Sequence, residues 1–289
     1  MARRLKVPPF IKTAVISYLG IRRLQTCKKR WLVNTNDGEP YFDINGAKLP
    51  DVTNISGYKT SLAYVLEDTF HVPYFYNDNH DRAIVEQVDK FMIEGPYGYT
   101  DGRFDVTVKK GDAVIDAGAW IGDFSAYAAN KGATVYAFEP VKSTYQLLCK
   151  TQMLNNIKGG GIYPVRKGLS SMEQNVDITI NTKISGANST VITDSSHKSS
   201  EKITLTTIDR FAKENNLERV DFIKADIEGA ERDMLRGATN VLRTFAPKLA
   251  ICTYHLPDDP QVLEQIIKQA NPKYRVIHTR HKLFASTVY

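Results

Sequence analysis

Residues 114–140 read VIDAGAWIGDFSAYAANKGATVYAFEP, and this stretch constrains the fold more than any other part of the chain. An apolar run leads into Gly118 and Gly122, a helical pattern follows, and a second apolar run ends at Glu139. Short apolar runs on either side of a helix are typical of parallel strands that are buried on both faces. The stretch therefore predicts a strand–helix–strand unit of an open parallel sheet.

The same alternation continues to the end of the chain. Apolar runs expected to form buried strands lie at 113–117, 133–138, 162–166, 221–227 and 249–254. Helical patterns lie at 122–131, 143–155, 207–215, 230–245 and 259–270. This order predicts an α/β fold in which helices cover both faces of a mostly parallel sheet.

Other patterns fall outside this alternation. Short alternating runs predict an antiparallel β insertion, with strands at 176–180, 189–193 and 202–206. The runs 274–278 and 283–289 predict a closing hairpin, and before the core we expect a helix at 81–93 and a strand at 104–108. We therefore divide the chain into an N-terminal extension, 1–85, and a cofactor-binding domain, 86–289.

The net charge of +6 is unevenly distributed. Residues 1–30 contain nine basic residues and no acid, so the rest of the chain is slightly acidic, which argues against a nucleic-acid partner. Within residues 1–30, apolar residues fall at helical spacing, but the run is too short to span a membrane. This amphipathic segment either packs on the body, which we favour, or rests on an anionic membrane surface.

The cysteine content indicates a reducing compartment. Three scattered cysteines make no disulfide framework and no metal-binding spacing: Cys27, Cys149 and Cys252. We expect a cytoplasmic protein, free or peripheral to a membrane. The sequence predicts no oligomeric state.

The turn between Gly118 and Gly122, called here the glycine turn, indicates which ligand binds. A dinucleotide site needs GxGxxG, but Trp120 stands where the second glycine would admit a pyrophosphate. Asp116 precedes the turn and favours a cation, and Glu139 ends the next strand, where an acid accepts ribose hydroxyls. A cationic nucleoside without phosphates meets these constraints, which predicts S-adenosylmethionine. The expected contacts are Asp116, Gly118, Ala119, Trp120, Gly122, Asp123, Glu139, Pro140, Asp226 and, as a lid or a packing residue, Tyr97.

Several motifs follow one another over roughly residues 90–289: DAGAWIGDFS, AFEP, TIDRF, DFIKADIEGAE, YHLPDD and the pair Arg280-His281. Together they resemble the FkbM family of S-adenosylmethionine-dependent methyltransferases. The resemblance implies a class I methyltransferase fold, a seven-stranded sheet whose last strand is antiparallel, and O-methylation of sugars or related natural products. Trp120 departs from the family pattern, which more often has a small or polar residue there.

The catalytic candidates lie at the ends of two predicted strands. Asp226 and Glu228 follow one strand and His255 follows the next, so their side chains are expected to meet beside the cofactor. A hydroxyl acceptor must lose its proton, and we predict that His255 is the general base. The carboxylates would orient the imidazole, hold the acceptor or contact the methionine end of the cofactor. Alternatively, His255 only satisfies a backbone group.

Some alternatives stay open. Asp226, Glu228, His255 and Asp258 together could hold Mg²⁺, although we predict no bound metal. The leading interpretation is a methyltransferase that acts on a small-molecule or glycan hydroxyl. The alternatives are an RNA methyltransferase that uses residues 1–30 as a clamp, and a non-catalytic cofactor-binding protein that docks on membranes.

Overall fold

The computed structural model describes residues 25, 28–36, 38–55, 69, 96–155, 160–181 and 198–288. The predicted helix at 81–93, the strand at 189–193 and most of the basic segment 1–30 lie outside these residues. Within the described part of the chain, no helix is long and apolar enough to cross a membrane.

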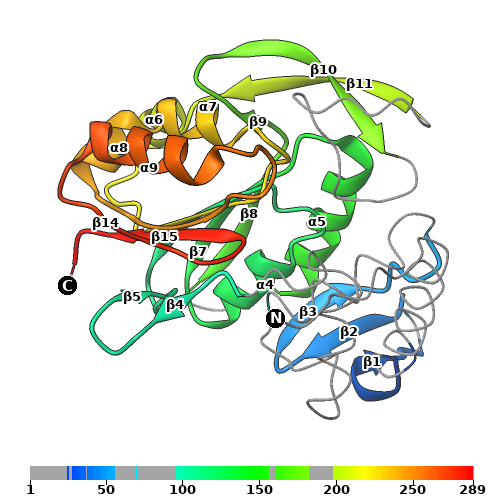
Figure 1. The fold of residues 1–289 in the computed structure, drawn as a ribbon. Coiled ribbons are helices and arrows are strands. Elements are labelled where there is room, and N and C mark those ends of the chain that lie inside the picture. Colours follow the sequence, from blue (N-terminus) through cyan, green and yellow to red (C-terminus); the bar gives the residue numbers. More distant parts are fainter. Residues whose placement is uncertain are drawn as a thin grey trace, which may run out of the picture.

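The centre of the molecule is a seven-stranded sheet (Figure 1). In spatial order its strands are β14 (Arg275–His278), β15 (Lys282–Ser286), β13 (Lys248–Cys252), β12 (Phe222–Ala225), β6 (Ala113–Ala117), β7 (Thr134–Phe138) and β8 (Gly161–Val165). Neighbouring strands from β13 to β8 pair in parallel, and β15 is antiparallel to both of its neighbours. The predicted sheet, including its antiparallel last strand, is confirmed.

Helices cover both faces of this sheet (Figure 1). On one side lie α4 (Asp123–Asn130) and α5 (Lys142–Leu154). On the other side lie α6 (Ile208–Glu214), α7 (Glu231–Arg236), α8 (Thr239–Thr244) and α9 (Asp259–Ala270). The prediction of a single helix at 230–245 was wrong, because the helix is interrupted at Gly237 and forms α7 and α8 instead. A Cβ there would lie 2.1 Å from the carbonyl oxygen of Ser170, so the backbones meet at this point.

Successive residues of each strand point to opposite faces of the sheet, so the core has two layers. Val114, Phe222 and Phe284 belong to the hydrophobic cluster that includes residues of α4 and α5. Their chain neighbours Ile115 and Ile223, with other strand residues, belong to the cluster formed with α6 to α9. Burial of both faces explains why these strands read as continuous apolar runs.

The predicted β insertion forms a separate small sheet. Its strands are β9 (Gly168–Leu169), β10 (Gln174–Asn181) and β11 (Lys198–Thr206), and β10 and β11 pair in antiparallel register. Ile178, Ile203 and Leu205 of this sheet pack with Val141, which follows β7. The insertion is therefore attached beside the end of β7, where the cofactor is expected.

The described part of the N-terminal extension packs on α4 and α5. It forms a three-stranded sheet of β1 (Leu32–Val33), β2 (Tyr41–Ile44) and β3 (Ala47–Pro50), whose apolar residues join the cluster on that side. Asn155, just after α5, exchanges hydrogen bonds of 2.8 and 2.6 Å with the backbone of Lys48. The short pair β4 (Tyr99–Thr100) and β5 (Asp105–Val106) precedes β6, and β5 falls within the predicted strand at 104–108.

Candidate active site

The turn after β6 is shaped by backbone packing. Gly118, Trp120 and Gly122 all have positive φ angles, of 72°, 49° and 89°, a conformation that disfavours most side chains. A Cβ on Gly118 would lie 2.0 Å from the carbonyl oxygen of Asp226. A Cβ on Gly122 would lie 2.7 Å from Cδ1 of Leu148 on α5. Both glycines therefore allow close contact between parts of the protein.

Asp116 of β6 is fully buried and has partners within the protein. Its carboxylate accepts a 2.6 Å hydrogen bond from Ser125 and lies 3.2 Å from Nζ of Lys224 on β12. Lys224 also donates a 2.6 Å hydrogen bond to the carbonyl oxygen of Gly118. Burial opposes the charged ammonium, but Asp116 and Asp226 outweigh it and raise the pKa of Lys224. The cation that Asp116 meets in this structure is Lys224.

Asp123, at the start of α4, also points into the protein. It is 7% exposed and accepts a hydrogen bond of 2.5 Å from Thr69. Burial raises the pKa of its carboxyl group to about 6. The acids on either side of the glycine turn are thus buried and bonded to neighbouring side chains.

A pocket opens at the carboxyl ends of β6, β7 and β12. Of the residues predicted from the sequence, it brings together Gly118, Trp120, Glu139, Pro140, Asp226 and Glu228. The other predicted site residues do not line it: Asp116, Ala119, Gly122, Asp123, Tyr97 and His255. Its remaining walls come from residues that the sequence analysis did not name as site residues: Val141, Lys167–Leu169, Ile178, Ile203, Leu205, Ile227 and Ala230, with Phe138 from the end of β7.

Glu139 presents its carboxyl group at one end of this pocket. It is only 7% exposed, and it accepts hydrogen bonds from the backbone N–H groups of Val141, at 2.9 Å, and of Trp120. Burial raises the pKa of Glu139 to about 8, although the two N–H groups oppose the shift. The group is therefore mostly protonated at neutral pH and becomes a full acceptor when it ionises.

The turn after β12 forms the other end of the pocket. Glu228 and Gly229 have positive φ angles of 54° and 98°, which turn the chain sharply before α7. Glu231 is fully buried and accepts hydrogen bonds from the backbone N–H groups of Ile227, at 2.8 Å, and of Gly229, at 3.0 Å. This buried carboxylate fixes the turn that carries Asp226 and Glu228.

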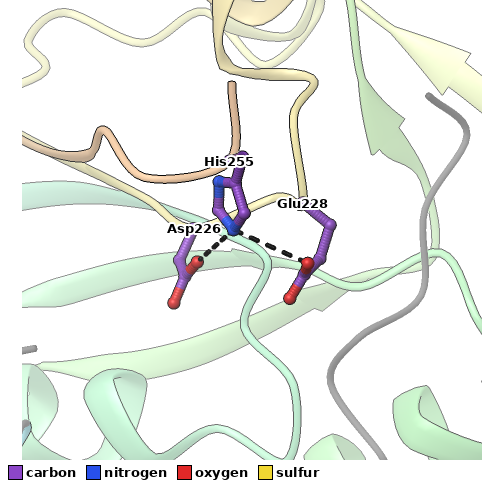
Figure 2. Close-up of side chains that lie close together, drawn as sticks. All are labelled: Asp226, Glu228 and His255. Atoms are coloured by element: carbon purple, nitrogen blue, oxygen red, sulfur yellow. Dashed lines mark ion pairs between the residues drawn. The ribbon is translucent and has the colours of Figure 1, made fainter. Parts of the chain in front are cut away.

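His255, just beyond β13, is surrounded by three carboxylates. Its Nε2 lies 3.6 Å from Oδ1 of Asp226 and 3.6 Å from Oε2 of Glu228 (Figure 2). On its other side, Nδ1 lies 3.0 Å from Oε1 of Glu231. The side chain is only 3% exposed. The predicted meeting of Asp226, Glu228 and His255 is thus present in the structure, and Glu231 joins it.

The charges in this group affect the protonation of His255. Burial lowers its pKa, but the hydrogen bond to Glu231 and the charges of Asp226 and Glu228 outweigh burial and raise the pKa to about 10. At neutral pH the His255 side chain is therefore a positively charged imidazolium, with a proton on each ring nitrogen. The general-base role of His255 stays a prediction, and it requires that one of these protons first be displaced.

Two tyrosines hold the carboxylate of Asp226. The hydroxyl of Tyr97 donates to Oδ2 at 2.6 Å, and the hydroxyl of Tyr254 donates to Oδ1 at 3.2 Å. Burial raises the pKa of Asp226, but the charges of His255 and Lys224 and the Tyr97 hydrogen bond outweigh it and lower the pKa. Tyr97 therefore lies behind the acidic end of the pocket, and its role as a lid stays a prediction.

Asp258 lies outside this group of acids. Its carboxylate pairs with Arg232 at 2.5 Å, and its side chain is largely exposed. Of the four residues considered for Mg²⁺, three place a ligand atom close to the others: Asp226, Glu228 and His255.

Sequence reasoning missed Lys224 and Glu231. Lys224 is a charged residue inside the apolar strand FIKA, and a buried charge in such a strand needs a partner. Glu231 lies in DIEGAE, three residues after Glu228, where its role depends on the turn geometry. The pocket walls from the β insertion carry no motif.

Comparison with known proteins relates this site to a family. The model of the methyltransferase FkbM domain matches residues 116–275, just over half of the chain. Hexuronic acid methyltransferase AglP of Haloferax volcanii is 29% identical over 163 residues, which cover 55% of this chain and 62% of that protein. Methyltransferase sdnD of Sordaria araneosa is 29% identical over 191 residues, covering 54% of this chain and 73% of that protein.

A solved structure shows a similar fold. The methyltransferase FkbM of Methylobacillus flagellatus aligns with a TM-score of 0.51 at 20% identity, over 94% of this chain and 60% of that one. This likeness supports the class I methyltransferase fold. The chain spans about three fifths of the length of AglP and of this structural neighbour.

Proposed function

Because the chain belongs to the FkbM family of methyltransferases, we propose that it transfers a methyl group from S-adenosylmethionine to a hydroxyl oxygen of a sugar or related acceptor. The observation that carries this proposal is the pocket at the carboxyl ends of the strands, whose two ends differ. Glu139 and apolar walls form one end, and the carboxylates of Asp226 and Glu228 form the other.

The first end fits an adenosine group. The carboxyl group of Glu139 is held by the N–H groups of Val141 and Trp120, and it lines the pocket where two ribose hydroxyls can donate to it. Leu169, Ile203 and Leu205 supply apolar surface that suits a flat base. Trp120 fills the turn and leaves no glycine at the position where a pyrophosphate would approach.

The second end fits the charged part of the cofactor and the acceptor. When bound, S-adenosylmethionine supplies a methyl group on a positively charged sulfur, and its amino group adds another positive charge. Asp226 and Glu228 line the pocket with negative charge that favours such groups. The same carboxylates can accept a hydrogen bond from an acceptor hydroxyl and orient its oxygen.

The acceptor class is inferred from a relative. AglP is named a hexuronic acid methyltransferase. The FkbM family model that this chain matches covers the turns after β6 and β12. We therefore propose a sugar hydroxyl, with a sugar acid as the first substrate to test. Residues of the β insertion that line the pocket are the nearest candidates to select the acceptor.

A mass-shift screen tests this function. The purified protein is incubated with S-adenosylmethionine and panels of uronic-acid glycans, neutral glycans and RNA. We expect one methyl group to be added to a uronic-acid glycan. Methylation of RNA alone would contradict the proposed acceptor, and failure to bind S-adenosylhomocysteine would contradict the proposed cofactor.

A further inference from the structure

We propose that Asp226, Glu228 and His255 bind one divalent transition-metal ion. Each side chain offers one ligand atom, and all three atoms lie within 4.8 Å of one another. Two carboxylate oxygens and one imidazole nitrogen suit Zn²⁺, which binds both kinds of ligand, or Mn²⁺, which favours carboxylates. Figure 2 shows the imidazole lying between the two carboxylates, with Nε2 facing both.

The separations fit a shared ion better than direct hydrogen bonds. Nε2 of His255 lies 3.6 Å from each of the two carboxylate oxygens, beyond ordinary hydrogen-bond length. An ion with ligands at about 2.1 Å in tetrahedral geometry places its ligand atoms roughly 3.4 Å apart. Small side-chain movements would therefore bring all three atoms onto one ion.

The imidazole is an independent sign of a missing ligand. Its side chain is 3% exposed, and Nε2 has no hydrogen-bond partner among the described residues. A buried polar atom without a partner is unfavourable, and few occur in folded proteins. A metal ion between Nε2 and the carboxylates would satisfy this atom.

Glu231 prepares the imidazole for this role. It lies 3.0 Å from Nδ1, and because a carboxylate only accepts hydrogen bonds, this contact favours a proton on Nδ1. Nε2 faces the proposed ion, which would replace the proton on that nitrogen. Metal-binding histidines commonly donate their second ring N–H to a carboxylate in this way. Glu231 is itself fixed by the N–H groups of Ile227 and Gly229, so the ring orientation is set by the turn.

The ion would face the pocket, because Asp226 and Glu228 line it. Its free positions would then be open to an oxygen of a bound molecule, as in metal sites with three protein ligands. That the molecule is the acceptor hydroxyl rests on the proposed function, whereas metal binding itself does not. The tyrosine hydroxyls on Asp226 hold one ligand in place.

Titration with Mn²⁺ alone, followed by electron paramagnetic resonance, tests the site. The spectrum of free Mn²⁺ weakens as the ion binds, so the titration gives stoichiometry and affinity without turnover. We expect one Mn²⁺ per chain. Glu228→Gln, which keeps the shape of the side chain but removes its charge, should weaken binding by about tenfold or more.

Asp258→Asn is the matched control, because Asp258 is an acid near the site that pairs with Arg232. It should change Mn²⁺ affinity by less than about twofold. Absence of Mn²⁺ binding to the wild-type protein, or equal affinity in Glu228→Gln, overturns the metal site. His255→Gln provides a second variant, and thermal unfolding of each variant verifies that it is folded.

Binding of S-adenosylhomocysteine to the same samples separates the two proposals. If the protein binds S-adenosylhomocysteine but no Mn²⁺, the metal site is wrong and the proposed function stands. If it binds Mn²⁺ but no S-adenosylhomocysteine, the metal site stands and the proposed cofactor is wrong.

Discussion

The turns after β6 and β12 lie side by side and use their acids differently. The strands pair in parallel, with Asp116 opposite Lys224, and each turn contains residues with positive φ angles. In the first turn, the carboxylates of Asp116 and Asp123 are buried against protein partners. In the second turn, Asp226 and Glu228 line the pocket beside His255. The first turn therefore serves mainly the fold, and the second carries the proposed chemistry.

This difference shows that an acid at a strand end need not face a ligand. Asp116 lies on the face of the sheet that packs against α4, and Lys224 from the neighbouring strand reaches it. Asp226 lies one residue beyond the end of β12, at the edge that opens to the pocket. Asp116 lies one residue before the end of β6, so a shift of two positions along the strand register separates the structural acid from the site acid.

The largest effect is expected from Asp116→Asn. The substitution leaves the buried ammonium of Lys224 without its nearest carboxylate, and breaking a buried ion pair costs about 4 kcal/mol of unfolding free energy. Urea denaturation measures this loss. Asp233→Asn is the control, because its pair with Arg236 is exposed and contributes about 0.5 kcal/mol or less. If Asp116→Asn kept full stability but lost cofactor binding, Asp116 would serve the cofactor rather than the fold, which contradicts the difference drawn between the two turns.

Gly118→Ala should come next, because the added methyl group would meet the backbone of Asp226 and the φ angle is 72°. We expect a loss of roughly 3 kcal/mol in unfolding free energy. Gly111→Ala has a similar φ of 83° but nothing within 4 Å of its added Cβ, so it should lose only about 1 kcal/mol. Equal losses in the two variants would show that contact between the turns is unimportant.

His255→Ala tests the chemical role of the second turn. With the acceptor found in the glycan screen, turnover should fall by about a hundredfold or more, while affinity for S-adenosylhomocysteine changes little. His278→Ala is the control, because His278 pairs with Glu264 away from the pocket. Turnover near the wild-type rate in His255→Ala would remove His255 from the mechanism.

The smallest predicted effect is a pH dependence from Glu139. Its pKa of about 8 means that Glu139, the proposed ribose acceptor, is mostly protonated at neutral pH and ionises as pH rises. We expect the ribose hydroxyls to donate to the ionised carboxylate, so affinity for S-adenosylhomocysteine should rise by up to about tenfold per pH unit below pH 8 and level off above it. Calorimetry from pH 6 to 9 measures this, and Glu139→Gln should remove the rise. The same slope in Glu139→Gln would assign the titration to another group.

The strands of the core could be predicted closely from the sequence. Runs such as AVIDA and KLAIC are buried on both faces, and that burial leaves an unmistakable apolar pattern. Because parallel strands end at one edge, the meeting of Asp226, Glu228 and His255 could be predicted as well. The break at Gly237 could not, because it depends on the backbone of Ser170, far away in the sequence.

The direction of individual side chains was harder to predict. Lys224 becomes the partner of Asp116 only once β12 lies beside β6 in a given register. The pocket walls at Ile178, Ile203 and Leu205 depend on how the β insertion packs near Val141, and no local motif records that packing.

A crystal structure of the complex with S-adenosylhomocysteine at pH 8 tests the central claim most directly. We predict that the ribose hydroxyls donate to Glu139, that the base contacts Leu169 and Leu205, and that the amino acid end points toward Asp226 and Glu228. A ligand bound elsewhere, or one whose ribose does not contact Glu139, would contradict this account.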